Sequence, residues 1–445
     1  MSDATPPSPS AAPPPSGPDA GTPARRSRRL SRMTAYAWSK HWPAEATLAL
    51  GGGILSLAGY CLQRSMSAPD WTPQALVVGG QALWILAPAW PRILARVQRN
   101  RAFAWIGVFA RGPLLLMAFA AITPLVGGDR DQGVGPWWLL FGGLLVANNL
   151  DAIYTPHRNA MIRANYALTA RGRIFGMIQL VSMVASVAGA MAAGQLLDRD
   201  PRWARVVFPV GATIAIVGYA LMARIRWRYD GPVELPAERG LELVRQSMRE
   251  AVAASVKTLK QDPDFRRFEL GFMLYGLGLL AATPLFVTHF AKIFDTEQWA
   301  TADRLVLPLT QLVLIGLVGR LSDRIGIVKV AGLSFALLVP FFVVMALVRT
   351  PWQLCAANVL FGLCMAGVNV SWSLGPLFFA PRGQAHHYSA VHMACVGVRS
   401  VLGPVLGYLV FRAVSFEAAL AMAAAFEVAA AVVTFRLARR VHLLT

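Results

Sequence analysis

The chain has 445 residues, of which 56% are hydrophobic and only 15% are charged. A soluble protein carries about 25% charged residues, so this composition excludes an ordinary soluble domain. Many apolar runs reach about 20 residues, the length that crosses a bilayer as an α-helix. The composition therefore predicts an all-α membrane protein with many transmembrane helices.

The net charge of +19 does not indicate a nucleic-acid partner, because the basic residues are expected in short loops on one side of a membrane. The sequence contains no Walker A motif and no nucleophile–base or metal-ligand spacing. Its four cysteines lie in or beside apolar segments, at Cys61, Cys355, Cys364 and Cys395. We therefore expect no enzymatic activity, no cofactor and no metal. The expected partners of this monomer are a small-molecule solute and membrane lipids.

Four regions follow one another along the chain. Residues 1–40 are rich in Pro, Ala and Ser and end in a basic cluster, which predicts a disordered tail that touches anionic lipid heads. Residues 41–223 (the N half) and 267–445 (the C half) each contain six apolar segments, separated by a polar linker at 224–266. Apolar residues recur at helical spacing within the linker, at Leu241, Val244, Met248, Val252, Val256 and Leu259. They predict an amphipathic helix, either on the membrane surface or packed on the loops.

The twelve apolar segments are the predicted transmembrane spans. They cover about 43–62, 72–92, 102–126, 136–158, 172–197, 204–223, 267–290, 301–319, 327–348, 352–377, 387–411 and 416–436. Most of the 42 Lys and Arg residues fall in the tails, the linker and the loops on the same side as these. Because basic loops stay in the cytoplasm, we expect a bacterial inner-membrane protein with both termini cytoplasmic.

Two stretches with the same outline form the fourth segment of each half. Residues 141–156, FGGLLVANNLDAIYTP, and 361–376, FGLCMAGVNVSWSLGP, start apolar, carry Asn and end at Pro. Aligned without a gap they share four identities, with Phe141, Gly142, Asn149 and Pro156 matching Phe361, Gly362, Asn369 and Pro376. Parallel repeats with polar, interrupted segments in matching places are typical of a transporter site near the bilayer midplane. The same residue types also pack helices together, so both interpretations stay open.

The eighth segment is followed by the octapeptide Gly319–Gly326, GRLSDRIG. It resembles the loop signature G-x-L-x-D-R-x-G of the major facilitator superfamily, which lies between spans 2 and 3 and often again between spans 8 and 9. The corresponding residues 91–98 depart from it, with Ala95 in place of the Asp and Gln98 in place of the final Gly. The resemblance implies a gating role for Gly319, Arg320, Asp323, Arg324 and Gly326.

The resemblance covers about residues 43–440, through the span count, the linker, the repeat and this loop. It implies a fold of twelve transmembrane helices in two parallel-related six-helix halves. It also implies an alternating-access carrier in which spans 1, 4, 7 and 10 line a central cavity.

Two arginines fall inside predicted spans, where an isolated charge is costly. Arg111 in the third span lies at a depth similar to that of Asp151 in the fourth. They form either a structural pair or a pair that Asp151 leaves to bind a proton or substrate during transport. Arg399 lies near the middle of the eleventh span, with no acidic residue expected on a facing span at that depth. It contacts either an anionic solute in the cavity or a backbone carbonyl.

The predicted substrate-binding set is Asn148, Asn149, Asp151, Asn369, Trp372, Arg399 and Gln311. Glu427 in the twelfth span is interpreted as a structural carboxylate. Two intramembrane arginines against few carboxylates favour an anionic or zwitterionic solute. The leading hypothesis is a secondary carrier driven by a proton gradient or by the solute's own gradient. The alternative is a scaffold or sensor of carrier ancestry that does not transport.

Overall fold

The computed structural model describes residues 23–86, 89–90, 99–119, 137–166, 168–227, 240–381 and 384–442, and every regular element in these ranges is a helix. The N half contains α1 (Pro23–Ser56), α2 (Ala58–Arg64), α3 (Thr72–Gln81), η1 (Ala82–Leu86), α5 (Arg99–Phe119), α6 (Trp137–Asn165), α7 (Leu168–Arg199), η3 (Pro201–Trp203) and α8 (Ala204–Ala223). The linker contains α9 (Gly240–Gln261). The C half contains α10 (Pro263–Phe290), α11 (Thr296–Ala300), η4 (Thr301–Val306), α12 (Leu307–Ile325), α13 (Ile327–Leu347), α14 (Pro351–Phe379), α15 (Ala385–Ala413) and α16 (Phe416–His442).

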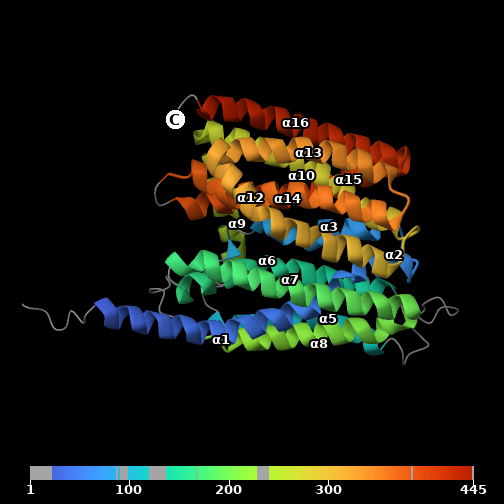
Figure 1. Ribbon diagram of the computed structural model, residues 1–445, viewed down its shortest axis with the longest axis horizontal. Coiled ribbons are helices and arrows are strands. Elements are labelled where there is room, and N and C mark those ends of the chain that lie inside the picture. Colours follow the sequence, from blue (N-terminus) through green and yellow to red (C-terminus); the bar gives the residue numbers. More distant parts are fainter. Residues whose placement is uncertain are drawn as a thin grey trace, which may run out of the picture.

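The long helices run side by side in two bundles, one for each half, and α1 begins at the same end at which α16 finishes (Figure 1). Ten helical stretches of the described residues are long and apolar enough to cross a membrane. Helix α6 and the α3–η1 stretch occupy the places of the other two predicted spans. The prediction of an all-α, multi-pass membrane protein is confirmed.

The two halves pack their helices in the same order. Helix α1 packs on α7 and α8 as α10 packs on α15 and α16. Helix α5 contacts α6 and α8 as α13 contacts α14 and α16, and α3 meets α6 as α12 meets α14. Each contact joins helices at matching places in their halves, so the parallel repeat indicated by the sequence is present in the packing.

Glycines allow these helices to approach backbone to backbone. A Cβ at Gly53 of α1 would lie 2.0 Å from the carbonyl oxygen of Ser186 on α7. A Cβ at Gly407 of α15 would lie 2.0 Å from the carbonyl oxygen of Ala281 on α10. Lipid tails do not drive helices together as water does, so close packing of small residues supplies much of the association energy. The glycines at these positions are therefore structural.

Helix α1 begins earlier than the sequence predicts. A disordered tail is expected through residue 40, but the helix starts at Pro23. Proline is accepted in the first helical turn because its missing N–H would have no partner there. The Ala and Arg residues that follow are good helix formers. Residues 1–22 lie outside the described residues.

The linker helix α9 is amphipathic, as predicted, and it also docks on the C half. Thr258 is buried and shares a hydrogen bond of 2.5 Å with Nε2 of His387 on α15. On another face of α9, Met248, Val252 and Val256 of the predicted apolar set remain exposed. The helix is therefore anchored to the C half while an apolar face stays exposed, and its contact with the membrane surface stays a prediction.

Candidate functional site

A cavity of about 420 Å³ lies between the two halves. Its walls come from α1, α2, α3 and α6 on one side and from α10, α11, η4, α13 and α14 on the other. Aromatic side chains cover much of it, from Phe286, Trp299, Phe341 and Phe361. Its polar groups come from Ser56, Asn148, Thr283, Asp303, Arg304 and Asn358. Small-molecule sites are concave, largely apolar and carry a few placed polar groups, so the cavity suits a small solute.

The charges on the cavity wall balance each other. Arg304 of η4 lies 3.0 Å from the carboxylate of Asp303 and donates to the carbonyl oxygen of Ser56, 3.2 Å away on α1. The guanidinium thus links the C half to the N half, and the adjacent carboxylate of Asp303 neutralises its charge. This part of the cavity offers no excess positive charge to an anion.

A latch of Tyr60, Arg64, Asp70 and Asp198 with the C-half residues that they contact joins the halves at the end remote from the start of α1. We name it the outer latch after the predicted orientation, which puts this end outside the cytoplasm. The hydroxyl of Tyr60 lies 2.9 Å and 2.7 Å from the carbonyl oxygens of Phe290 and Phe294. Arg64 forms an ion pair of 2.6 Å with Asp295. These contacts hold the two halves together at this end of the molecule.

Asp198, at the end of α7, extends the outer latch. Its two carboxylate oxygens accept hydrogen bonds from the backbone N–H groups of Thr296 and Glu297, at 2.9 Å and 2.6 Å. These N–H groups begin α11, where helical donors lack partners of their own. Lys292 lies 3.5 Å from Asp70 and adds a weaker ion pair. A carboxylate of one half therefore caps a helix of the other.

A second contact between the halves, the α3–α15 seam, runs along α3 and η1. The hydroxyl of Ser400 on α15 donates to Oε1 of Gln81 over 2.6 Å. A Cβ at Gly397 would lie 2.4 Å from the backbone nitrogen of Ile85. The chain segments meet here without a side chain between them.

The two repeat asparagines of the N half have different surroundings. Asn148 lines the cavity. Asn149 instead donates to the carbonyl oxygens of Gly79 and Leu145, at 2.5 Å and 2.8 Å. Its amide ties α3 to α6, which is the packing role that the sequence left open. A solute-binding role for either residue stays a prediction.

Asp151 and Arg111 form an ion pair inside the N half. Nη2 of Arg111 lies 3.0 Å from Oδ1 of Asp151, and the hydroxyl of Tyr219 donates to the same oxygen over 3.3 Å. The Arg111 side chain is 11% exposed and that of Asp151 39%. The pair joins α5, α6 and α8, while one carboxylate keeps contact with open space. Its participation in transport stays a prediction.

In the C half, the matching asparagine is less firmly held. Nδ2 of Asn369 lies 3.5 Å from Oε1 of Gln311 on α12, at the limit of a hydrogen bond. Both side chains are only partly buried. This weak contact holds the two side chains loosely, and a solute-binding role for either residue stays a prediction.

Arg399 is buried, with 3% of its surface exposed. Its Nη1 donates to the carbonyl oxygen of Phe272. The Cζ atom lies 5.2 Å from the ring centre of Tyr275 and 5.0 Å from that of Trp372, within the range of cation–π contacts. The backbone-carbonyl alternative from the sequence is therefore present, and Trp372 covers the guanidinium. Solute binding by Arg399 stays a prediction.

The expectation that no acidic residue lies near Arg399 is wrong. Glu427 of α16 packs beside Gly278 of α10, two residues from Gly276, which Arg399 adjoins. Glu269 of α10 pairs with His392, whose ring contacts the same Trp372 that covers Arg399. Glu427 is fully buried, and its carboxyl oxygens have no hydrogen-bond partner among the described residues. A Cβ at Gly278 would lie 3.1 Å from Oε1 of Glu427, which places this carboxyl against α10. The depth of side chains on different helices was not recoverable from span boundaries alone.

Glu269 and His392 form a buried pair that the sequence analysis missed. Nδ1 of His392 lies 2.9 Å and 3.1 Å from the two carboxyl oxygens of Glu269. The His392 ring packs at right angles on Trp372, 5.0 Å between centres. An ionisable residue within a predicted span is a functional candidate by default. That rule would have identified both residues.

Residues 319–325 of the predicted gating loop are helical and form the end of α12, and Gly326 alone makes the tight turn into α13. Gly326 has a φ of +86°, which L-residues with side chains rarely adopt. The side chains of Arg320, Asp323 and Arg324 are exposed. The first loop copy, residues 91–98, lies outside the described residues. Gating by either loop stays a prediction.

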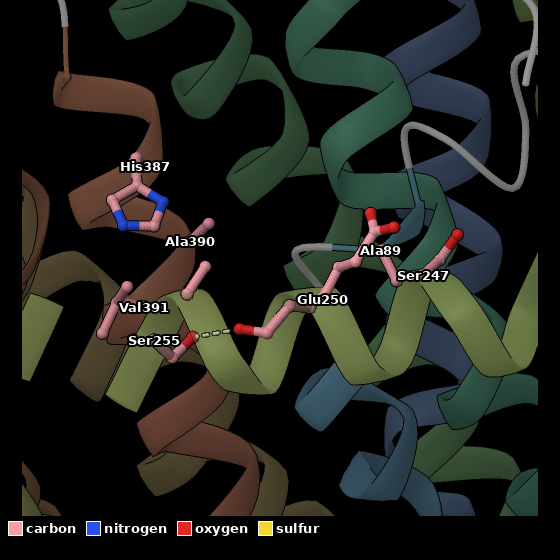
Figure 2. Close-up of a pocket in the computed structure, with 9 residues that line it drawn as sticks. Ala89, Ser247, Glu250, Ser255, His387, Ala390 and Val391 are labelled. Carbon is pink, nitrogen blue, oxygen red and sulfur yellow. Dashed lines mark hydrogen bonds between the residues drawn. The ribbon is translucent and has the colours of Figure 1, made fainter. Parts of the chain in front are cut away.

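A smaller pocket of about 220 Å³ lies where α9 meets α15 (Figure 2). It is lined mainly by small side chains, together with Glu250 and His387. None of the predicted site residues reaches it. The part of the chain that the structure describes contains no cluster of His, Cys, Asp and Glu suited to a metal ion.

No protein-family model and no curated protein matches this sequence. Solved structures match over most of the chain. The nucleoside transporter NupG has a TM-score of 0.67 at 14% identity, covering 90% of this chain and 99% of that chain. The human organic anion transporter MFSD10 has a TM-score of 0.60 at 13% identity, covering 90% and 99%. A bacterial homologue of the human lysosomal transporter Spinster, inward-facing and unoccupied, has a TM-score of 0.60 at 14% identity, covering 92% and 97%.

Proposed function

We propose that this chain, which has the twelve-helix fold of the major facilitator superfamily, is a secondary carrier that moves a small solute by alternating access. The observation that carries the proposal is the cavity between the halves, together with the outer latch that joins the halves at one end. Alternating access requires a central site whose two ends open in turn. Contacts of one end that consist of a few hydrogen bonds and ion pairs suit reversible opening.

The solute that we favour is anionic or zwitterionic, as the sequence predicts. Arg399 supports this, since its Nε has no hydrogen-bond partner among the described residues. The structurally similar transporters carry the names of nucleoside, organic anion and peptide transporters. These names therefore supply three solute classes for a first panel of probes. Proton coupling is proposed as the driving force.

The test is flux through purified protein in liposomes, with succinate, dialanine and uridine as anionic, zwitterionic and neutral probes. Thermal stabilisation by each probe in detergent selects the concentrations. We expect uptake of succinate or dialanine to exceed that of protein-free liposomes and to rise with an acidic exterior. The Tyr60→Phe variant tests whether the outer latch takes part in transport. Its uptake rate should differ from that of the wild type, because it lacks the hydroxyl that joins the halves.

The alternative function is a membrane scaffold or sensor that does not transport. The change from Asp to Ala95 in the first loop copy is the observation that favours it. A scaffold would show no uptake of any probe above protein-free liposomes. Uptake of uridine alone would retain the carrier and remove the anionic-solute assignment.

A further inference from the structure

Three charged or titratable side chains share one buried site in the C half. Glu269 lies on α10, while His392 and Arg399 lie on α15. The side chains of His392 and Glu269 are 2% and 4% exposed, and Arg399 is 3% exposed as a residue. Burying a charge is costly unless a partner neutralises it. The proton content of this site therefore determines whether its charges balance.

A charge count shows two states. With one proton on the Glu269–His392 pair, the pair is neutral overall and Arg399 leaves the site with one positive charge. Without that proton, the Glu269 carboxylate cancels the charge of Arg399. A solute anion compensates the site only in the first state. In a buried environment this difference is large, because charges interact far more strongly there than in water.

We propose that Glu269 and His392 form a proton-binding site that makes the C half receptive to a negative group beside Arg399. One proton and one negative charge then enter together. This inference rests on the proposed carrier function and specifies its coupling. The indole of Trp372 covers both groups, 5.0 Å from the His392 ring and 5.0 Å from Cζ of Arg399. Its displacement opens the guanidinium to the solute.

The N half contains a comparable buried glutamate, which lies in the other half from Trp372. Glu45 lies on α1, the first helix of its half, and is buried like Glu269. Its carboxylate contacts both Nε2 of His41, at 3.3 Å, and Nε of Arg158. By the same count a proton on His41 would leave this cluster with one positive charge, but here the arginine is already paired directly with the carboxylate. Glu45 is therefore the control for a buried glutamate beside a histidine.

Other titratable groups face the site from the surrounding helices: Tyr275 on α10, Cys364 on α14, Cys395 on α15 and Glu427 on α16. Phenols and thiols are uncharged in water at neutral pH. Glu427 is a carboxyl without a partner among the described residues. It is therefore the competing proton site, and the experiment includes Glu427→Gln.

The first test reads protonation directly and needs no solute. A protonated imidazole beside an indole quenches its fluorescence, so emission of the full-length protein is titrated with pH in detergent. The difference between the wild type and Trp372→Phe isolates the signal of Trp372. We expect a pH-dependent step in this difference that is lost in Glu269→Gln and His392→Gln and kept in Glu45→Gln and Glu427→Gln.

Two results overturn the proposal. One is a wild type without a Trp372-dependent step, which is measurable even when the charge variants fold poorly. The other is a step that survives in both Glu269→Gln and His392→Gln, or that disappears in Glu427→Gln. Thermal unfolding of each variant identifies those that have lost their fold.

The second test reads coupling in liposomes with succinate or dialanine. Because a buried ionisable group in a membrane span is a functional candidate, Glu269→Gln should reduce acid-driven accumulation of the probe by about tenfold or more. The variant should still exchange labelled for unlabelled probe. Unchanged acid-driven accumulation would overturn the coupling assignment. A wild type that moves neither probe instead argues against the carrier function, and the fluorescence step then decides the proton site alone.

Discussion

Buried charges are stabilised differently in the two halves at the scale of single residues. In the N half, Arg111 and Arg158 each contact a carboxylate directly. In the C half, Arg399 contacts a backbone carbonyl and two aromatic rings instead. A charge paired directly is expensive to separate, whereas one held by ring faces and a carbonyl changes partners more easily. The C half is therefore the better place for a solute-dependent response.

Asp151→Asn should destabilise the N half. The substitution removes the negative partner of Arg111, whose side chain is only 11% exposed. Leaving a buried donor poorly satisfied costs about 1–3 kcal/mol. We expect a lower midpoint of thermal unfolding in detergent.

The control for Asp151→Asn is Asp323→Asn, which changes an exposed carboxylate to the same amide. It should alter stability by no more than about 0.5 kcal/mol. The double substitution of Arg111 and Asp151 by leucine should recover part of the loss, because it removes the orphaned charge as well. Equal midpoints for Asp151→Asn and the wild type would show that the pair contributes nothing.

Gly276→Ala should disturb Arg399. A Cβ at this position would lie 2.1 Å from Cδ of Arg399, so the guanidinium must move away from its carbonyl and its rings. Overpacking of this kind costs about 1–3 kcal/mol. Gly52→Ala in the first helix of the other half is the control, since nothing lies within 4 Å of its added Cβ. The comparison fails if both alanines shift the unfolding midpoint equally.

At the scale of elements, the outer latch is built from short segments and from the ends of long helices. Helix α2 and the α10–α11 connection supply Tyr60, Arg64 and Asp295. The Arg64–Asp295 pair is half exposed and worth about 0–1 kcal/mol. Tyr60 is buried and bonds a carbonyl of the partner half, so it should contribute more.

Tyr60→Phe should therefore favour opening at the outer end. The change removes a buried hydroxyl and leaves the carbonyls of Phe290 and Phe294 without that donor, which costs about 1–3 kcal/mol. A cysteine placed at Ser56, on the cavity wall, reports the opening by its reaction rate with a membrane-impermeant thiol reagent. We expect a rate increase of about fivefold or more. Tyr36→Phe, at an exposed position, is the control, and equal rates would contradict the role of Tyr60.

At the scale of the whole molecule, the fold could be predicted and much of the site could not. Apolar run length and the repeat at 141–156 and 361–376 indicated the two halves, because both depend on local sequence. The partners of Arg399 are set by the rotation and depth of three helices, and Glu269 is separated from His392 by 123 positions. The sequence also did not show that Asn148 lines the cavity whereas the neighbouring Asn149 packs α6 on α3.

The orientation in the membrane is a prediction that concerns the whole chain. We expect the start of α1, the end of α16, α9 and the Gly319–Gly326 loop all on the cytoplasmic side, since basic residues concentrate there. Epitope tags at these places and at Arg349 are probed with antibody before and after membrane permeabilisation. Only the tag at Arg349 should react beforehand. Antibody binding to the tag in α9 before permeabilisation would show that the predicted orientation is reversed or wrong.

The α3–α15 seam has a geometric consequence for solute size. Gly397 meets Ile85 backbone to backbone, so the halves cannot separate there without losing that contact. We therefore expect the seam to act as a hinge between the halves. The other contact between the halves, where α7 meets α11 and η4, should then separate by the largest distance when the halves open. A larger solute is tolerated best where the halves separate most and least at the hinge. Selection for the passage of bulkier molecules would accordingly enrich substitutions along α7, α11 and η4 and leave Gly397 unchanged.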